Sequence, residues 1–251
     1  MTRGWRRGLV AWVAWVGVSA VAAAEVRVAV ASNFAAPMQR LAAAFEQDSG
    51  HRVRLSVGST GALYAQIRNG APFDVLLAAD DETPQNIERE GLGVAGSRIT
   101  YAIGRLVLWS RQAERVDANG EVLRRGDVER LALANPKLAP YGRAAVETLT
   151  RMGVWPAWQS RVVMGENIAQ TYQFVSTGNA PLGFVALSQV WVQGQIREGS
   201  AWIVPADWHR PIRQDAIVLR AGSGNPAAQA LMRYLRSGPA RALIRAHGYE
   251  N

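Results

Sequence analysis

The residues best suited to chemistry in this sequence are uncharged hydrogen-bond donors, placed where strand patterns give way to helix patterns. Ser32 and Asn33 end a β-branched run that starts at Val26, and Ser59 follows a second strand pattern that ends at Gly58. At such a junction the first N–H groups of the helix lack partners, and the helix dipole adds partial positive charge. These junctions therefore predict a site for a small anion.

Two further junctions of this kind lie later in the chain. Tyr141 follows Pro140 at the start of a helix pattern, and Ile168 follows the turn 165–167. Ile168 has no polar side chain, but its backbone N–H at a helix start can donate. Preorganised neutral donors suit a dehydrated oxyanion, because each charged contact would need its own desolvation. An ordinary turn or capping role stays open for each residue alone, but four junctions together favour an anion site.

Groups that a metal ion would need are sparse. The three histidines, His51, His209 and His247, form no metal-ligand spacing, and the chain has no cysteine. The acidic run 80–82 precedes a predicted helix, which favours helix capping over a metal cluster. We expect no cofactor and no direct metal ligands.

An enzyme is the alternative from a different class of function. A secreted hydrolase or transferase could use Ser32 or Ser59 as its nucleophile, but the sequence places no base beside either serine. The string 58–61 is also not a G-x-S-x-G elbow, because its serine directly follows the first glycine. We therefore expect no enzyme activity. A protein that only offers an interaction surface would leave the four junctions unexplained.

The elements that must position these donors alternate between strands and helices. Strand patterns cover 26–31, 52–57 and 73–79, and helix patterns follow each of them. This alternation predicts an α/β fold with mostly parallel sheets covered by helices. We expect two lobes, with 25–105 and 217–251 in lobe 1 and 106–216 in lobe 2.

The N-terminus has the pattern of a secretory signal peptide over residues 1–24. Three arginines precede an apolar run over 9–21 and then three alanines, and this run is short for a membrane span. An uncleaved N-terminal anchor is the alternative. We expect a mature, soluble protein that starts at Glu25.

Composition limits the partners of this mature protein. The leader carries three arginines and no acidic residue, so its removal lowers the formal charge from +8 to +5. The remaining basic residues are scattered, with no dense tract that could follow a phosphate backbone, and we expect no nucleic acid partner.

Six short segments occur together and in a specific order: 28–34, 58–61, 70–75, 135–142, 165–170 and 183–188. Over nearly the whole mature chain they resemble the periplasmic molybdate-binding proteins of ABC transporters. The resemblance implies the type II periplasmic-binding-protein fold, two α/β lobes joined by two crossover segments, with a tetrahedral oxyanion held between them.

The resemblance also implies roles for the donor residues. Ser32 and Ser59 match hydroxyl donors of the first lobe, Asn33 matches an amide beside the first serine, and Tyr141 and Ile168 match backbone N–H donors of the second lobe. Many members have a tyrosine where this chain has Ala186. We expect Asn33 and Tyr141 to replace that missing donor, and we expect Glu166 to point away from the ligand.

The function implied is capture of molybdate or tungstate in the periplasm and delivery to an ABC transporter permease by a monomeric protein. A carrier of sulfate or another tetrahedral oxyanion with the same fold is the alternative.

Overall fold

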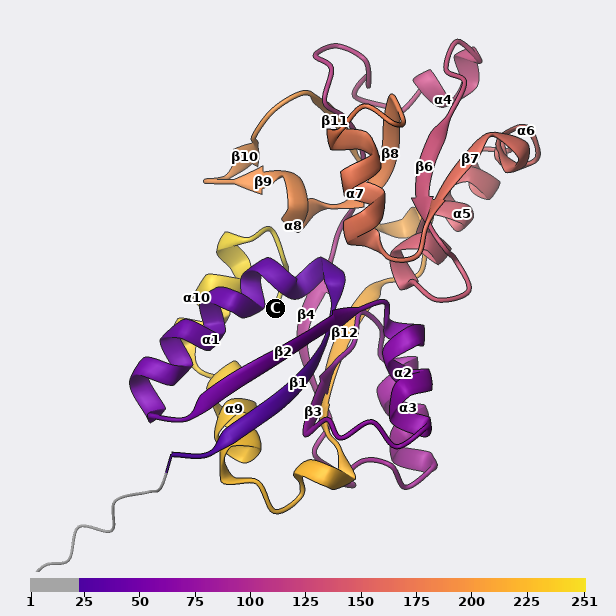
Figure 1. The fold of residues 1–251 in the computed structure, drawn as a ribbon. Helices are drawn as coiled ribbons and strands as arrows, with labels where there is room; N and C mark the ends of the chain where they lie inside the picture. Colours follow the sequence, from indigo (N-terminus) through magenta and orange to yellow (C-terminus); the bar gives the residue numbers. More distant parts are fainter. Residues whose placement is uncertain (1–22) are drawn as a thin grey trace, which may run out of the picture.

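The structure is a computed structural model that describes residues 23–251. It contains two five-stranded sheets with helices on both faces of each, and Figure 1 shows the resulting lobes one above the other. This architecture confirms the predicted two-lobed α/β fold. The predicted signal peptide lies outside the described residues, apart from its last two positions. No helix in the described part of the chain has the length and apolar character needed to cross a membrane.

The sheet of lobe 1 has the strand order β2-β1-β3-β12-β4. β1 pairs in parallel with β2 and β3, whereas β12 runs antiparallel to β3 and β4. β3 is buried throughout and β1 over most of its length, as expected for strands covered on both faces. The bounds are β1 Glu25–Ala31, β2 Arg52–Gly58, β3 Val75–Leu77, β4 Ile99–Gly104 and β12 Ile212–Val218.

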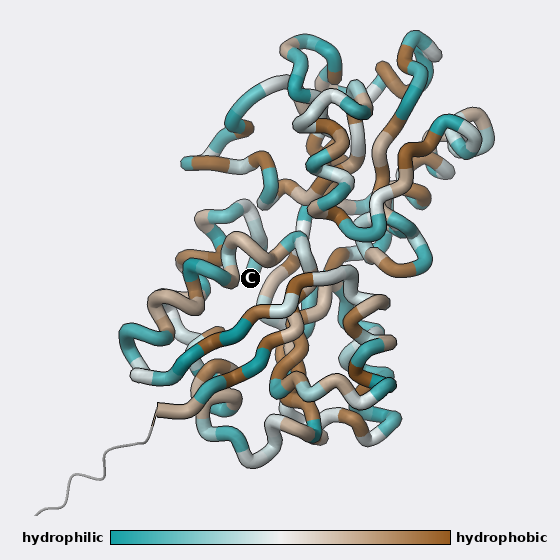
Figure 2. The backbone as a smooth tube through the Cα atoms, viewed as in Figure 1, coloured by the Kyte–Doolittle hydropathy of each residue, from teal (hydrophilic) through white to brown (hydrophobic). Residues whose placement is uncertain are grey.

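Helices cover both faces of this sheet because successive strand residues point to opposite sides. Val28 and Val30 pack with α1, α9 and α10, whereas Ala29 and Leu76 pack with α2 and α3. Figure 2 shows hydrophobic residues gathered in the centre of lobe 1, where β3 and β12 run. The helices are α1 Ala35–Ser49, α2 Thr60–Arg68, α3 Glu82–Arg89, α9 Pro226–Leu235 and α10 Gly238–Ala246, with short 3-10 turns η1 Ser32–Phe34 and η4 Arg220–Gly222.

The sheet of lobe 2 has the strand order β11-β5-β8-β6-β7. β6 is parallel to β7 and β8, and β5 is antiparallel to β8 and β11. A separate antiparallel pair, β9 with β10, projects beside it. The bounds are β5 Leu106–Ser110, β6 Leu131–Ala134, β7 Val162–Gly165, β8 Leu182–Ala186, β9 Trp191–Val192, β10 Gln195–Ile196 and β11 Ser200–Ile203.

Lobe 2 also has an apolar core on each face of its sheet. Ala145 and Leu149 of α5 pack against one face, and Val175 of α7 packs against the other. The helical segments are α4 Val122–Arg125, α5 Pro140–Arg151, α6 Trp155–Trp158, α7 Ile168–Ser176 and α8 Leu187–Val190, with 3-10 turns η2 Gln159–Arg161 and η3 Ala206–Trp208.

The chain passes between the sheets twice. β4 ends at Gly104 and β5 begins at Leu106, so Arg105 alone joins the lobes on the outward path. On the return path β12 begins at Ile212, which pairs with Gly104 of β4. β12 therefore pairs with strands of the lobe 1 sheet from its first residue. The expected division of the chain into 25–105 with 217–251 and 106–216 stays a prediction.

Candidate functional site

A small cavity lies between the two lobes, where four strand-to-helix junctions meet. Its volume, measured as the space open to the centre of a water-sized sphere, is about 10 Å³, which is roughly what one water molecule needs. All five residues predicted from the sequence contribute to its wall, although they come from both lobes. The wall consists of Ala31, Ser32, Asn33, Gly58, Ser59, Thr60, Ala79, Ala139, Pro140, Tyr141 and Ile168.

The wall of this cavity carries no charged side chain. Its polar groups are hydroxyls, one side-chain amide and backbone atoms at helix starts. Helix-start N–H groups favour anions without requiring a buried counter-charge. The cavity is therefore chemically suited to a small anion rather than to a cation.

The hydroxyls of Ser32 and Ser59 have free hydrogen-bonding capacity. Ser32 opens η1 directly after β1, and Ser59 is the N-cap residue of α2. The two residues are only 7% and 6% exposed, yet neither hydroxyl bonds to another of residues 23–251. An N-cap serine ordinarily accepts a bond from its helix, but Ser59 makes no such bond. The capping role that the sequence left open for Ser59 is therefore absent.

Asn33 lines the cavity, but its amide nitrogen is already engaged. Nδ2 donates to Oε1 of Gln214 at 2.8 Å and to the hydroxyl of Tyr249 at 3.0 Å. An amide nitrogen has two hydrogens, so both are used. Donation from this amide to a ligand would require one of these bonds to break.

Tyr141 is the second residue of α5, after Pro140 at the first position. Its hydroxyl accepts a bond from Nε2 of Gln214 at 3.2 Å. Burial raises the pKa of Tyr141 well above its ordinary value, so the hydroxyl keeps its proton. The backbone N–H of Tyr141 lies in the first helical turn, where no partner within the helix exists.

Ile168 is the first residue of α7 and contributes a backbone donor. The side chain of the N-cap residue Asn167 accepts bonds from the N–H groups of Ala169 and Gln170, at 3.0 and 3.1 Å. This capping leaves the N–H of Ile168 without a partner among the described residues. The N–H groups of the second and third residues of α7 are therefore capped, whereas that of the first residue, Ile168, is free to donate into the cavity.

Sequence reasoning missed Thr60, although it lies in the same motif as Ser59. Its Oγ1 accepts a bond from the N–H of Ala79 at 3.0 Å, which connects the start of α2 to the segment that follows β3. The neighbouring Gly61 donates its N–H to the carbonyl oxygen of Leu138 in lobe 2 at 2.9 Å. A Cβ at Gly61 would lie 3.0 Å from the Leu138 backbone, so a glycine permits this close approach. The glycines at positions 58 and 61 were the sequence feature that could have indicated a close approach of another segment here.

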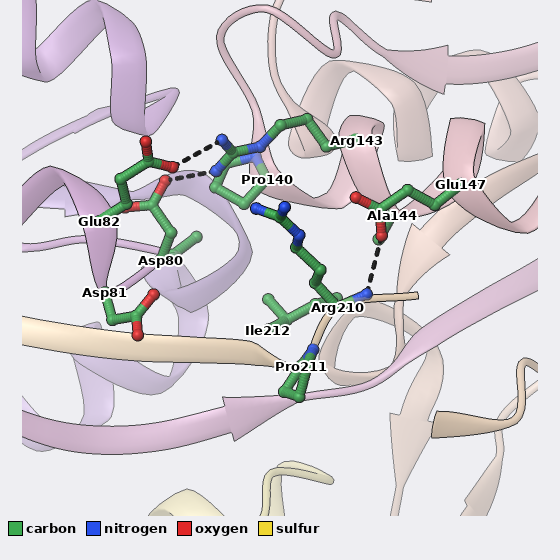
Figure 3. A pocket seen from close by; sticks show the side chains of 11 residues that line it. Asp80, Asp81, Glu82, Pro140, Arg143, Ala144, Glu147, Arg210, Pro211 and Ile212 are labelled. Carbon is green, nitrogen blue, oxygen red and sulfur yellow. Dashed lines mark hydrogen bonds and ion pairs between the residues drawn. The ribbon is translucent and has the colours of Figure 1, made fainter. Parts of the chain in front are cut away.

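A second, larger pocket of about 90 Å³ shares Ala79 and Pro140 with the first. Figure 3 shows Arg143 of lobe 2 directed at two carboxylates of lobe 1, Asp80 at 2.9 Å and Glu82 at 3.1 Å. Burial raises the pKa of Asp80, against the opposing effect of hydrogen bonds from Thr83. These ion pairs connect the lobes outside the cavity.

In the acidic run, Oδ1 of Asp80 accepts the N–H of Thr83 at 2.9 Å in the first turn of α3, as the predicted capping role requires, whereas the N-cap residue Asp81 makes no such bond. Over residues 23–251, no three His, Asp or Glu side chains are grouped as a metal site. Glu166 is exposed and is not part of the cavity wall. The wall contains no general base that could activate Ser32 or Ser59.

Comparisons with known proteins agree with this geometry. The family model described as bacterial extracellular solute-binding protein matches residues 26–250. A molybdate-binding protein ModA from Azotobacter vinelandii is 56% identical over 92% of this chain and 91% of its own. A molybdate-binding protein ModA from Rhodobacter capsulatus is 44% identical over 97% of this chain and 96% of its own. A solved structure of the Azotobacter vinelandii periplasmic molybdate-binding protein, 38% identical in the superposition, matches with a TM-score of 0.87 over 90% of this chain and 99% of its own.

The chain belongs to the family of bacterial extracellular solute-binding proteins. The resemblance to molybdate-binding proteins that the sequence motifs indicate is confirmed by these relatives. Members of this family are binding components of transport rather than enzymes.

Proposed function

We propose that this protein binds molybdate or tungstate between its lobes in the periplasm and delivers it to the permease of an ABC transporter. The observation that carries the proposal is the cavity wall, where uncharged donors from four helix starts converge from both lobes without a charged side chain. We propose Ser32, Asn33, Ser59, Tyr141 and Ile168 as the residues that contact the oxyanion, with Asn33 and Tyr141 acting through their backbone N–H groups because their side chains already bond to Gln214. The relatives named for molybdate binding support the choice of ligand.

Closure of the lobes gives this site its affinity. In an open form only the donors of one lobe reach the anion, whereas in the closed form both sets do, and this difference shifts the population toward closure. The closed form is the one that a permease can distinguish from the empty protein. We further propose that the protein is exported by cleavage after residue 24 and acts as a monomer.

Selectivity follows from the size and protonation of the ligand. Sulfate carries the same charge as molybdate but is smaller, so it leaves donors unpaired, at about 1–3 kcal/mol for each buried one. Phosphate is often protonated at neutral pH, and its proton needs an acceptor. The cavity wall has no carboxylate to accept it.

The test is a titration of the mature chain, residues 25–251, with molybdate, tungstate, sulfate and phosphate, followed by calorimetry and tryptophan fluorescence. We expect tight binding of the first two anions and at least about a hundredfold weaker binding of the others, which two unpaired donors would produce. Equal affinity for sulfate and molybdate would favour a general tetrahedral oxyanion carrier. Absence of binding to all four would overturn the proposal.

A further inference from the structure

Gln214 of β12 is a fully buried polar residue at the boundary between the lobes. It is 0% exposed, and its amide makes three side-chain hydrogen bonds. Oε1 accepts from Nδ2 of Asn33 at 2.8 Å, and Nε2 donates to the hydroxyl of Tyr141 at 3.2 Å. The hydroxyl of Tyr101 lies 3.0 Å from Oε1 and 2.9 Å from the carbonyl oxygen of Ala78, so its one hydrogen is shared between these two acceptors. The amide of Gln214 thus bonds to Asn33 in the lobe 1 part of the cavity wall and to Tyr141 in the lobe 2 part.

A β-bulge helps to place this amide. Gln214 pairs with Ala102 and Asp215 pairs with Thr100, so Tyr101 of β4 has no partner in the ladder. A bulge re-aims side chains locally, and here the extra residue Tyr101 reaches Gln214 with its hydroxyl. The next residue is anchored separately, because Asp215 accepts bonds from Arg98 at 2.6 Å and from Thr100 at 2.7 Å.

Gly104, at the end of β4, lies close to the hydrogen bond between Gln214 and Tyr141. A Cβ at this position would lie 2.1 Å from the Tyr141 hydroxyl and 2.7 Å from Nε2 of Gln214. The bond between Gln214 and Tyr141 therefore occupies space that any other residue at Gly104 would fill. This position lies directly before Arg105, where the chain first crosses to lobe 2.

We propose that Gln214 is a positioning residue that sets the spacing between the lobe 1 and lobe 2 donors and thereby the size of oxyanion that the site accepts. This inference rests on the proposed function. The amide suits this place because it accepts at one end and donates at the other without carrying a charge, whereas a thioether can donate no bond and accepts only weakly. Because the amide bonds Asn33 and Tyr141 directly, a change in its length or polarity alters how far apart the two walls lie when the lobes close.

The test compares dissociation constants for molybdate and for sulfate in wild-type protein and in the variants Gln214→Met and Gly104→Ala. Methionine keeps the length of the side chain but loses all three bonds, and alanine at 104 forces the Gln214 and Tyr141 contact apart. The control is Thr148→Val in α5, because Thr148 is also 0% exposed but its hydroxyl bonds only to the carbonyl of Ala144 in its own helix.

We expect both variants to weaken molybdate binding by about tenfold or more, and sulfate binding by less than about threefold, because sulfate already leaves donors unpaired. The control should change neither constant by more than about twofold. Equal losses for both anions, or no loss, would overturn the spacing role. Weak binding of molybdate to the wild-type protein would instead contradict the proposed function. If Gln214→Met does not fold, Gly104→Ala decides the question.

Discussion

Ser32 and Ser59 bring unengaged hydroxyls to a cavity whose other polar side chains, those of Asn33, Thr60 and Tyr141, already have hydrogen-bond partners. Each hydroxyl is free to donate to a ligand, and a hydrogen bond to a charged acceptor contributes more than one to a neutral acceptor. Asn33 and Tyr141 differ, because their side-chain groups already bond to Gln214. At the scale of single residues, the wall thus contains two kinds of polar side chain. Some are free to donate to a ligand, and others are held by bonds to Gln214 and position the wall around the ligand.

Replacing either serine with alanine tests this division. We expect Ser32→Ala and Ser59→Ala each to raise the dissociation constant for molybdate by about tenfold or more, since a hydrogen bond to a charged group contributes about 1.5–3 kcal/mol. Ser160→Ala is the control, because Ser160 is exposed on η2 outside the cavity. Calorimetry on the three variants measures the effect. An unchanged constant for both cavity variants would show that the hydroxyls do not touch the ligand.

At the scale of elements, the strand-to-helix junctions could be predicted because the residues that define each junction are adjacent in the sequence. A β-branched run, a small polar residue and a helix pattern follow one another within a few positions at Ser32 and Ser59. Contacts between distant parts of the chain have no such signature. Gln214 and Asn33 are 181 positions apart, and Tyr249 and Asn33 are 216 apart. The antiparallel pairing of β12 with β3 and β4 likewise has no signature in adjacent residues.

The loop before α4 has a carboxylate that orders it, and this gives a prediction about stability. Burial raises the pKa of Asp117, but bonds from the N–H groups of Glu121, Val122 and Asn119 outweigh it and lower the pKa to about 2. A carboxyl with a lowered folded pKa stabilises the protein above its unfolded pKa of 3.8, and this contribution is lost as the pH falls toward 2.

We therefore expect Asp117→Asn to lower the free energy of unfolding by about 1–2 kcal/mol at pH 7 and to make almost no difference near pH 2. Urea denaturation at both pH values measures this. Asp127→Asn is the control, because Asp127 is a half-exposed carboxylate 3.6 Å from Arg115, and such a pair contributes little. A pH-independent loss in Asp117→Asn would contradict the electrostatic cause.

At the scale of the whole molecule, two sets among the contacts that join the lobes differ in where they lie. The buried bonds around Gln214 lie beside the cavity, whereas the ion pairs of Arg143 with Asp80 and Glu82 lie outside it (Figure 3). Contacts outside the cavity cannot distinguish one bound anion from another. They affect only how easily the lobes close.

Arg143→Ala is expected to weaken molybdate and sulfate binding by the same factor, about two- to fivefold, because a partly exposed ion pair contributes about 1 kcal/mol or less. The loss should shrink at high salt, since screening already weakens the pair in the wild-type protein. Titrations at low and high ionic strength measure both effects. A change in the ratio of the two affinities would show that Arg143 acts on the ligand directly.

The most direct test of the account is a crystal structure of the mature protein with molybdate bound. The account predicts a single anion in the cavity between the lobes, within hydrogen-bonding distance of the hydroxyls of Ser32 and Ser59 and the backbone N–H groups of Tyr141 and Ile168. An anion bound elsewhere, or held chiefly by arginine side chains such as Arg143 or Arg210, would contradict it.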